Sequence, residues 1–413
     1  MSEAILAPKL RFPEFSGDWE EKKLGEFLIS TLREIDKPQT NYLAIGLRSH
    51  FKGTFQKPDS NPFKIAMDKL FQVEENDLIV NITFAWEGAI AIVKKNDKGG
   101  LVSHRFPTYT FDKHITNHLF FQFQFIQKRF RYMLGVISPG GAGRNRVMSK
   151  KDFVKLKTLL PSLPEQQKIA SFLTSVDNKI EQLTKKQELL EKYKKGLMQK
   201  IFSQEIRFKA NDGSDYPDWE EKNIDSLPIT ISDGNYGEQY PTSKDFKKIG
   251  VPFLRANNIK NLKVSKNDIR YITIEQHNIL TSGHLKTNDI LITTRGELGN
   301  IALVDDRFHN ANINAQICLL RIDDSSILNY KYLLISLNSN SCKKQYKRFE
   351  TGTALKQLPK GSLKKIKLNI PLLPEQLKIA NFLSSIVNKI EQIGKQLDET
   401  KLFKKALLQQ MFI

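Results

Sequence analysis

Cysteine is nearly absent from this chain of 413 residues, which contains only Cys318 and Cys342. Two cysteines form neither a disulfide framework nor, at this spacing, a CxxC metal pair. No apolar run reaches the length of a transmembrane helix, and the first residues, MSEAILAPKLRF, lack the apolar core of a signal peptide. We therefore expect a reduced, cytoplasmic protein that does not contact a membrane.

Motifs that would indicate catalysis are also missing. His114 and His118 are four residues apart but have no further metal-ligand pattern with them. The sequence contains no GxxxxGK(S/T) loop for nucleotide phosphates and no (N/D)PP(Y/F) motif of the kind used in base amino-methylation. PDWEEK at 217–222 resembles a nuclease motif, but its spacing is too short for the acids to hold a metal from separate strands. We predict no catalytic residue, no metal site and no cofactor in this chain.

Basic residues are abundant, and their distribution is uneven. The chain has 64 Lys and Arg against 45 Asp and Glu, a net charge of +19. Residues 1–160 carry a net +8 and residues 206–370 a net +7, whereas 161–205 and 371–413 carry +2 each. This charge favours a polyanionic partner, most often nucleic acid. A basic protein without such a partner is the alternative.

Two segments of the chain are nearly identical and lie 210 residues apart. LPEQQKIASFLTSVDNKIEQL occupies 163–183, and LPEQLKIANFLSSIVNKIEQI occupies 373–393. Between 161–183 and 371–393, 16 of 23 positions are identical. The same offset aligns YKKGLMQKIF with FKKALLQQMF further on. The chain is therefore an internal duplication.

Each repeated segment has the pattern of a long helix. Pro164 and Pro374 suit the first helical turn, and apolar residues then alternate at spacings of four and three, as in a coiled coil. The first seam is Ile169, Leu173, Val176, Ile180, Leu183, Gln187, Leu190, Lys194, Leu197 and Ile201, and the second is Ile379, Leu383, Ile386, Ile390, Ile393, Leu397, Thr400, Lys404, Leu407 and Met411. We predict that the two helices pair antiparallel. Two amphipathic helices packed on unrelated domains are the alternative.

The two basic blocks share a weaker pattern. DWEEK opens both, and we assign Trp19 and Trp219 to the core. DLIVNITFAWEGAIAIV at 77–93 and DILITTRGELGNIALV at 289–304 each predict two strands joined by a turn that contains Gly88 or Gly299. Each block closes with a glycine-containing basic loop and a lysine-rich strand. We predict four parts: domains of one α/β (α+β) fold at 1–160 and 206–370, separated by antiparallel coiled-coil helices at 161–205 and 371–413, with a pseudo-twofold internal repeat.

Two variable basic domains, each followed by a helix that opens LPEQ.KIA.FL, resemble the specificity subunit of type I restriction–modification enzymes along essentially the whole chain. The resemblance implies that each domain is a target-recognition domain that reads one half of a bipartite double-stranded DNA sequence. It also implies that the helices dock two methyltransferase subunits, which restriction and translocation subunits join. S-adenosylmethionine, ATP and magnesium would then belong to the partner subunits. An RNA-binding or scaffold protein that uses the helices only for assembly is the alternative.

Base discrimination relies on side chains with paired donors and acceptors, chiefly Arg for guanine and Asn or Gln for adenine. Phosphate contacts and turn formers will account for part of any such set. Our candidates for DNA binding are Asn81, Trp86, Arg105, Arg144, Asn145 and Arg146 in the first domain, and Arg255, Asn257, Asn258, Arg295, Asn312, Asn314, Gln316, Lys356 and Gln357 in the second.

The helices are more alike than an apolar seam alone requires, because polar residues match as well. We interpret these as two copies of one docking surface for a shared partner. A duplication that has not yet diverged is the alternative. The candidate docking residues are Glu165, Gln166, Lys168, Lys179 and Glu181, with Glu375, Gln376, Lys378, Lys389 and Glu391 in the second copy.

Overall fold

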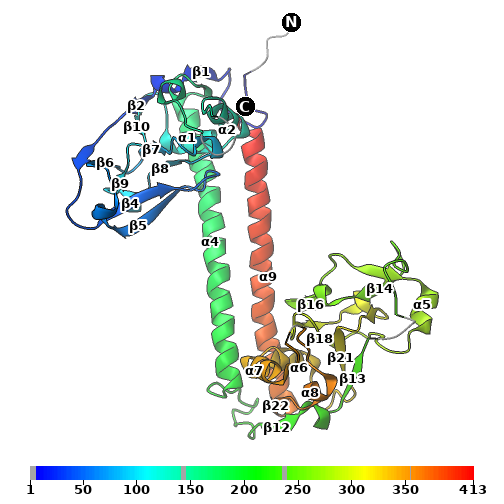
Figure 1. Ribbon diagram of the computed structural model, residues 1–413. Helices are drawn as coiled ribbons and strands as arrows, with labels where there is room; N and C mark the ends of the chain where they lie inside the picture. Colours follow the sequence, from blue (N-terminus) through cyan, green and yellow to red (C-terminus); the bar gives the residue numbers. More distant parts are fainter. Residues whose placement is uncertain (1–5, 141–145, 235–239, 354) are drawn as a thin grey trace. The chain divides into compact units, whose positions relative to one another are not determined.

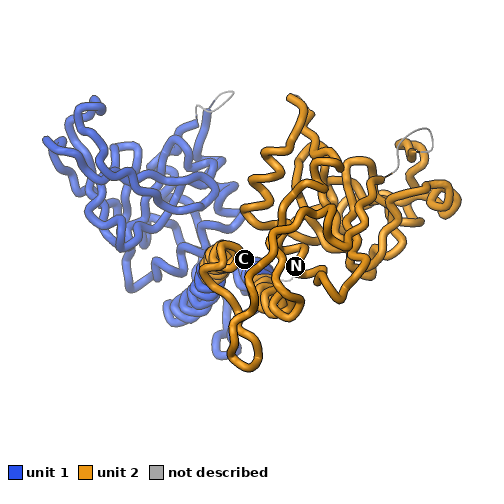
Figure 2. Tube along the Cα trace, turned by 90° about the horizontal axis from the view of Figure 1, so that it is seen from below, with its two compact units in different colours: residues 1–185, 394–413 blue, residues 186–393 orange. Residues whose placement is uncertain are grey.

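The computed structural model describes residues 6–140, 146–234, 240–353 and 355–413 (Figure 1). These residues form two compact units, coloured separately in Figure 2. Unit 1 comprises the chain up to residue 185 together with 394–413, and unit 2 comprises 186–393. Each unit therefore contains one basic domain, the first half of the long helix that follows it and the second half of the other long helix.

Unit 1 combines short strands with three short helices. Its strands are β1 Glu20–Lys23, β2 Leu28–Ser30, β3 Glu34–Asp36, β4 Tyr42–Leu47, β5 Thr54–Ser60, β6 Lys69–Gln72, β7 Leu78–Val80, β8 Ile90–Ile92, β9 Leu101–Val102, β10 Thr108–Phe111 and β11 Lys157–Leu160. Its short helices are α1 His118–Phe125, α2 Lys128–Val136 and α3 Lys150–Phe153. Within the described residues the sheet orders are β1-β11, β2-β10-β7-β8 and β3-β6-β9-β4-β5.

Unit 2 is built in the same way. Its strands are β12 Glu220–Asn223, β13 Ile229–Asp233, β14 Val251–Leu254, β15 Ile259–Lys260, β16 Leu262–Val264, β17 Arg270–Ile272, β18 Ile290–Thr293, β19 Ile301–Leu303, β20 Asn312–Ile313, β21 Ile317–Ile322 and β22 Lys367–Ile370. Its short helices are α5 Ile274–Ile279, α6 Tyr330–Leu337, α7 Asn340–Phe349 and α8 Lys360–Lys364. The described strands pair in the orders β12-β22, β13-β21-β18-β19-β16-β15 and β17-β14-β20.

The two predicted hairpins are present. β7 pairs antiparallel with β8, and β18 pairs antiparallel with β19. Gly88 and Gly299 sit in the connecting turns with φ of 81° and 76°, a left-handed backbone that favours glycine. A Cβ at Gly88 would also lie 2.9 Å from the ring of Phe51, and one at Gly299 would lie 2.9 Å from the ring of Tyr346. The turns need glycine for both reasons.

The two tryptophans occupy the cores, as predicted. Trp19 is buried against Phe120 and Phe412 in unit 1. Trp219 is buried against Phe202 and Tyr332 in unit 2. In each unit the tryptophan thus packs against the last turn of a long helix or a residue just beyond it, so this helix end is part of the core.

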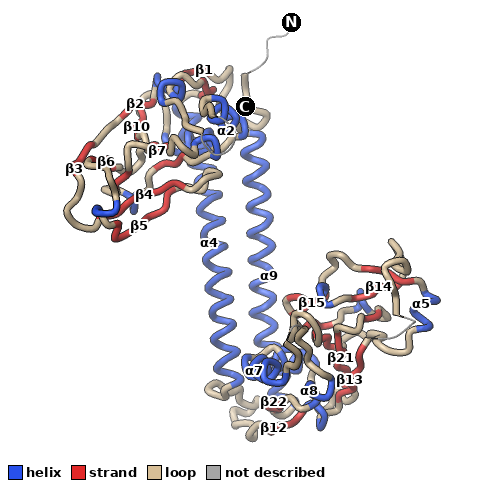
Figure 3. The backbone as a smooth tube through the Cα atoms, viewed as in Figure 1, coloured by secondary structure: helices blue, strands red, loops and turns tan. Residues whose placement is uncertain are grey.

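The long helices run antiparallel, and both appear in Figure 3 as the longest blue segments. They are α4 Leu163–Phe202 and α9 Leu373–Gln410. In unit 1, Ile169 near the start of α4 shares a core cluster with Leu407 near the end of α9. In unit 2, Ile379 near the start of α9 shares a cluster with Ile201 near the end of α4. The predicted pairing through apolar seams is confirmed. Among the described residues, none of the helices combines the length and apolar character needed to span a bilayer.

Candidate nucleic-acid interface

Four of the predicted DNA-binding residues of unit 1 converge on one loop, which follows β7. Asn81 begins it, and its side-chain oxygen accepts a hydrogen bond from the Thr83 amide at 3.0 Å. The Trp86 indole donates to the Thr83 carbonyl at 3.2 Å, and Arg105 donates to the Thr83 hydroxyl at 3.3 Å. The guanidinium of Arg146 lies over the Trp86 ring, 5.2 Å from its centroid. Arg144 and Asn145 lie outside the described residues.

A corresponding loop follows β18 in unit 2. Arg295 and Gln357 form an isolated backbone bridge beside the end of this strand. Gln316 is exposed, and its side-chain oxygen accepts a hydrogen bond from Asn314 at 3.0 Å. Lys356 is exposed and pairs with Glu350 at 2.7 Å. The structure therefore brings Arg295, Gln316 and Gln357 to one edge of the sheet.

Two pairs of equivalent backbone hydrogen bonds give these loops the same backbone arrangement, which we call the shared frame. The Ile82 amide donates to the Arg105 carbonyl at 3.0 Å, and the Thr294 amide donates to the Gln316 carbonyl at 2.8 Å. The Ile82 carbonyl accepts from Met148 at 2.8 Å, as the Thr294 carbonyl accepts from Leu358 at 2.9 Å.

Position for position, this frame makes Gln316 the counterpart of Arg105. Counting back two residues from Met148 and Leu358 also makes Lys356 the counterpart of Arg146. One backbone arrangement thus presents different hydrogen-bonding groups in the two units.

A second group of candidates lies on the turn after β14. Arg255 donates to the Asp268 carboxylate at 2.6 Å, and Asn257 donates to the same carboxylate at 3.3 Å. The hydrogen bond from Arg255 lowers the pKa of Asp268. Because its guanidinium already has a carboxylate partner, Arg255 would have to exchange that partner to contact DNA.

Three candidates of unit 2 are buried, and their assignment as direct DNA contacts is wrong. Asn258 is fully buried; its side chain accepts from the Arg255 amide and donates to the Asn267 carbonyl. Asn312 is fully buried beside His277, and Asn314 is 5 % exposed. Buried side chains at these positions hold the loops in which their exposed neighbours lie. These three residues were chosen by residue type alone. The local sequence does not reveal whether a polar residue is buried.

Helix α2 supplies residues that the sequence reasoning missed. A surface pocket of about 480 Å³ is lined by Trp86 and Arg146 together with Lys128, Arg131 and Tyr132 of α2. Tyr132 is 73 % exposed, so its ring is available for contact with a partner. Basic side chains interleaved with exposed aromatic rings are typical of nucleic-acid surfaces. The signal was present in KRFRY at 128–132, where basic and aromatic residues are interleaved, but these residues were not among the candidates.

The first two polar residues of the repeated helix motif are buried, which corrects their assignment to a docking surface. Glu165 accepts two hydrogen bonds from Arg11, at 2.8 and 2.7 Å, and Glu375 accepts from Arg207 in the same way. Both carboxylates are fully buried. In each case the hydrogen bond to the glutamate is the main cause of the raised pKa of the arginine. Glu375 also accepts from the Trp219 indole at 3.0 Å.

Gln166 and Gln376 are buried as well, and each binds the loop ahead of a short helix, α1 or α6. Gln166 accepts from the amide of Asn117, the residue that caps α1, and donates to the carbonyls of Ile115 and Pro161. Gln376 accepts from Asn329, the cap of α6, and donates to the equivalent carbonyls of residues 327 and 371. The Glu-Gln pair therefore connects each domain to the helix that follows it by hydrogen bonds. This structural role is enough to explain why both copies of the motif contain the pair.

The remaining docking candidates differ in their surroundings. Lys168 pairs with Glu14 at 3.0 Å, and Lys378 donates to the Lys209 carbonyl at 2.6 Å. Glu391 pairs with Lys263 at 2.6 Å. Lys179, Glu181 and Lys389 are exposed and make no ion pair with any residue that the structure describes. These three keep the surface position that a docking role requires.

Comparison with known proteins decides the family. The profile of the type I restriction modification DNA specificity domain matches residues 16–192 and again residues 216–401. The chain belongs to this family. Its two matches coincide with the two copies of the domain and their helices, so the duplication seen in the sequence is a duplication of the specificity domain.

Individual relatives agree with this assignment. The chain is 26 % identical to the type I restriction enzyme MjaVIII specificity subunit of Methanocaldococcus jannaschii over 97 % of this chain and 92 % of the relative. Its fold resembles a type I restriction–modification S subunit from M. genitalium, with a TM-score of 0.61, 16 % identity and 99 % of each chain covered. A structure from a study of complex assembly in the type I R-M system has a TM-score of 0.53 at 17 % identity, covering 94 % of this chain and 96 % of that one.

Proposed function

We propose that this specificity subunit recognises a bipartite sequence in double-stranded DNA, with one half-site read by each recognition domain. The supporting observation is the shared frame of the two loops, in which Arg105 and Arg146 of unit 1 correspond to Gln316 and Lys356 of unit 2. Arg suits guanine and Gln suits adenine in the major groove. Two similar domains with different side chains at equivalent positions would read two different half-sites.

Charge supports DNA as the partner. The two domains carry +15 of the net charge of +19, in two blocks of similar size. Basic side chains around the loops would contact phosphates and give an affinity that falls with salt, while the loop tips discriminate between bases. An RNA-binding or scaffold protein would not need two different sets of groups in one frame.

The subunit would act as the non-catalytic part of a cytoplasmic complex. We propose that the exposed polar residues of α4 and α9 dock two methyltransferase subunits, one at each copy of the motif, and that restriction subunits join this assembly. S-adenosylmethionine, ATP and magnesium would be bound by those partners. The absence of catalytic motifs from the sequence supports the assignment of catalysis to the partner subunits.

The decisive experiment exchanges one domain. Residues 206–370 are replaced by the matching block of a related specificity subunit, and the methylated sites of the host genome are mapped by sequencing. We expect only one half of the bipartite motif to change, because unit 1 keeps its own loops. The reciprocal exchange of residues 1–160 is the matched control and should alter only the other half.

Two results would contradict the proposal. A change in both halves after one exchange would mean that the domains do not read independently. Equal affinity of the purified chain for duplex and single-stranded nucleic acid, with no preferred sequence, would instead favour the RNA-binding or scaffold alternative. A preference for duplex over single-stranded nucleic acid therefore distinguishes the DNA-reading proposal from the RNA-binding or scaffold alternative before any target sequence is known.

A further inference from the structure

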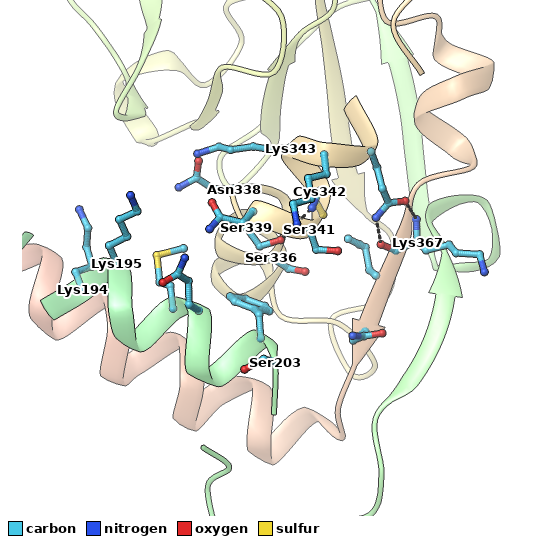
Figure 4. Close-up of a pocket in the computed structure, with 18 of the residues that line it drawn as sticks. Lys194, Lys195, Ser203, Ser336, Asn338, Ser339, Ser341, Cys342, Lys343 and Lys367 are labelled. Carbon is cyan, nitrogen blue, oxygen red and sulfur yellow. Dashed lines mark hydrogen bonds between the residues drawn. The ribbon is translucent and has the colours of Figure 1, made fainter. Parts of the chain in front are cut away.

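Unit 2 contains a basic groove outside its predicted reading loops. The groove has a volume of about 1160 Å³ and lies between the last turns of α4 and helix α7, with β22 at its floor. Seven basic and three acidic side chains line it. Figure 4 shows Lys194 and Lys195 extending from α4, with Asn338 and Lys343 on the opposite wall. Cations from two separate elements therefore face one space.

Most of these cations have no carboxylate partner. Lys192 and Lys195 of α4, and Lys343, Lys344 and Arg348 of α7, form no ion pair with any described residue. Like charges gathered around one groove repel one another, and the seven cations outnumber the three carboxylates that line it. An anionic occupant would remove that repulsion.

The internal repeat shows that one groove lysine lacks the ion-pair partner that its counterpart has in unit 1. In unit 1 the seam lysine Lys404 forms an ion pair with Asp177. The 210-residue offset makes Lys194 the counterpart of Lys404, and Val387 the counterpart of Asp177. Among the residues that the structure describes, Lys194 pairs with Glu191, one turn away on its own helix, at 2.7 Å. Unit 2 thus lacks the carboxylate that neutralises this position in unit 1.

The chemistry of the lining favours phosphate. Lysines, with serine and asparagine side chains such as Ser341 and Asn338, are the groups that proteins use on phosphate oxygens. A protein partner would normally require an apolar centre with exposed aromatic anchors. The aromatic ring in the groove, Phe202, instead packs against Trp219 and Tyr332 of the core.

We infer that this groove binds the sugar-phosphate backbone of DNA without reading its sequence. The inference rests on the proposed function, and it adds a second contact in unit 2 that supplies affinity while the loops after β14 and β18 supply specificity. Lysine ammonium groups on flexible side chains attract phosphates whatever the base sequence. The contribution of the groove to DNA affinity would therefore be the same for every sequence and would weaken with salt.

The test uses the full-length chain and a random-sequence DNA duplex as the probe. The groove variant K192Q/K195Q/K343Q/K344Q is compared with K185Q/K186Q/K395Q/K401Q, which removes four exposed lysines of the long helices that lie outside the groove lining. Both variants lose the same net charge. Binding is measured at several salt concentrations, and thermal unfolding checks that both variants are folded.

We expect the slope of log affinity against log salt to shrink by about 0.9 for each lost phosphate contact, up to about 3.6 for the groove variant, and to change much less for the control. Val387→Asp introduces a second carboxylate for Lys194, at the position that Asp177 holds beside Lys404, and should lower the slope by at most about 0.9 with no lysine removed. The methylated sequence of the host should stay the same with either variant.

Two outcomes would overturn the inference in distinguishable ways. If the wild-type chain binds no duplex, the proposed function itself fails. If the wild type binds and the groove variant keeps its slope, the groove does not contact phosphates. In that case, loss of partner subunits from the groove variant during purification would assign the groove to an acidic protein surface.

Discussion

The guanidinium of Arg11 donates two hydrogen bonds to the carboxylate of Glu165, from Nε at 2.8 Å and from Nη2 at 2.7 Å. Arg207 and Glu375 repeat this arrangement at 3.2 and 2.8 Å. Each arginine lies near the start of a recognition domain, and each glutamate lies in the first turn of the helix that follows that domain. The pair therefore ties the two ends of a domain together, and its role is structural.

We predict that Glu165→Ala destabilises unit 1 by roughly 3 kcal/mol, because removal of one partner leaves a largely buried charge uncompensated. Denaturant unfolding of the full-length chain would measure this loss. Glu375→Ala should have a similar effect on unit 2. The control is Lys168→Ala, which breaks the exposed pair with Glu14 and should cost less than about 1 kcal/mol. Equal losses for the two kinds of variant would contradict a structural role for the glutamates.

Periodicity was enough to predict the long helices and the hairpins, because alternating or heptad spacing determines which face is buried. It could not predict the role of the LPEQ motif. Glu165 meets an arginine 154 residues away, and Gln166 meets Asn117 across 49 residues. Similarly, the sequence alone does not distinguish Asn258 from Gln316, since both are polar residues in loops. The fold buries Asn258 and leaves Gln316 exposed. The local sequence shows the type of each residue, but which residues each one contacts depends on long-range packing.

The loop after β7 provides a prediction about affinity. Arg105→Ala and Arg146→Ala should each weaken binding of the target duplex by about 1–3 kcal/mol, if each forms a bidentate contact with guanine. Mapped methylation should show relaxed specificity in one half-site only. Arg129→Ala is the matched control, because Arg129 is an exposed arginine of α2 outside the pocket around Trp86. A uniform loss across all sequences would instead identify phosphate contacts.

The exposed residues of the repeated helices provide a prediction about assembly. The charge reversal K179E/E181K should remove one methyltransferase subunit from the complex, and K389E/E391K should remove the other, since like charges would then face the partner. The second variant also breaks the pair between Glu391 and Lys263. Mass measurement of the purified complexes gives the number of subunits directly.

A control distinguishes docking from a general effect of charge. K186E/E188K reverses two exposed residues of α4 where the repeat has Gln396 at the first position. This variant should keep both methyltransferase subunits. Retention of two subunits by a chain that carries both reversals, at 179/181 and at 389/391, would show that these faces are not the docking surface.

His284, which stacks on His277, should make the stability of unit 2 depend on pH. Their rings stack with centroids 4.5 Å apart, and Nε2 of His284 is buried with no hydrogen-bond partner in the described structure. Burial, and secondarily the charge of His277, lowers the pKa of His284 from the ordinary 6.5. The folded unit therefore keeps this ring neutral at a pH where the unfolded chain takes up a proton.

It follows that stability is highest above about pH 6.5 and falls as the pH drops through that value, by at most about 1.4 kcal/mol per pH unit for one group. Unfolding measured from about pH 7.5 to about pH 5.5 should show a smaller decline for His284→Gln than for the wild type. His309→Gln is the control, because His309 is exposed and outside the stacked pair. If His284→Gln loses stability on acidification as steeply as the wild type, the stacked histidines are not the source of the pH dependence.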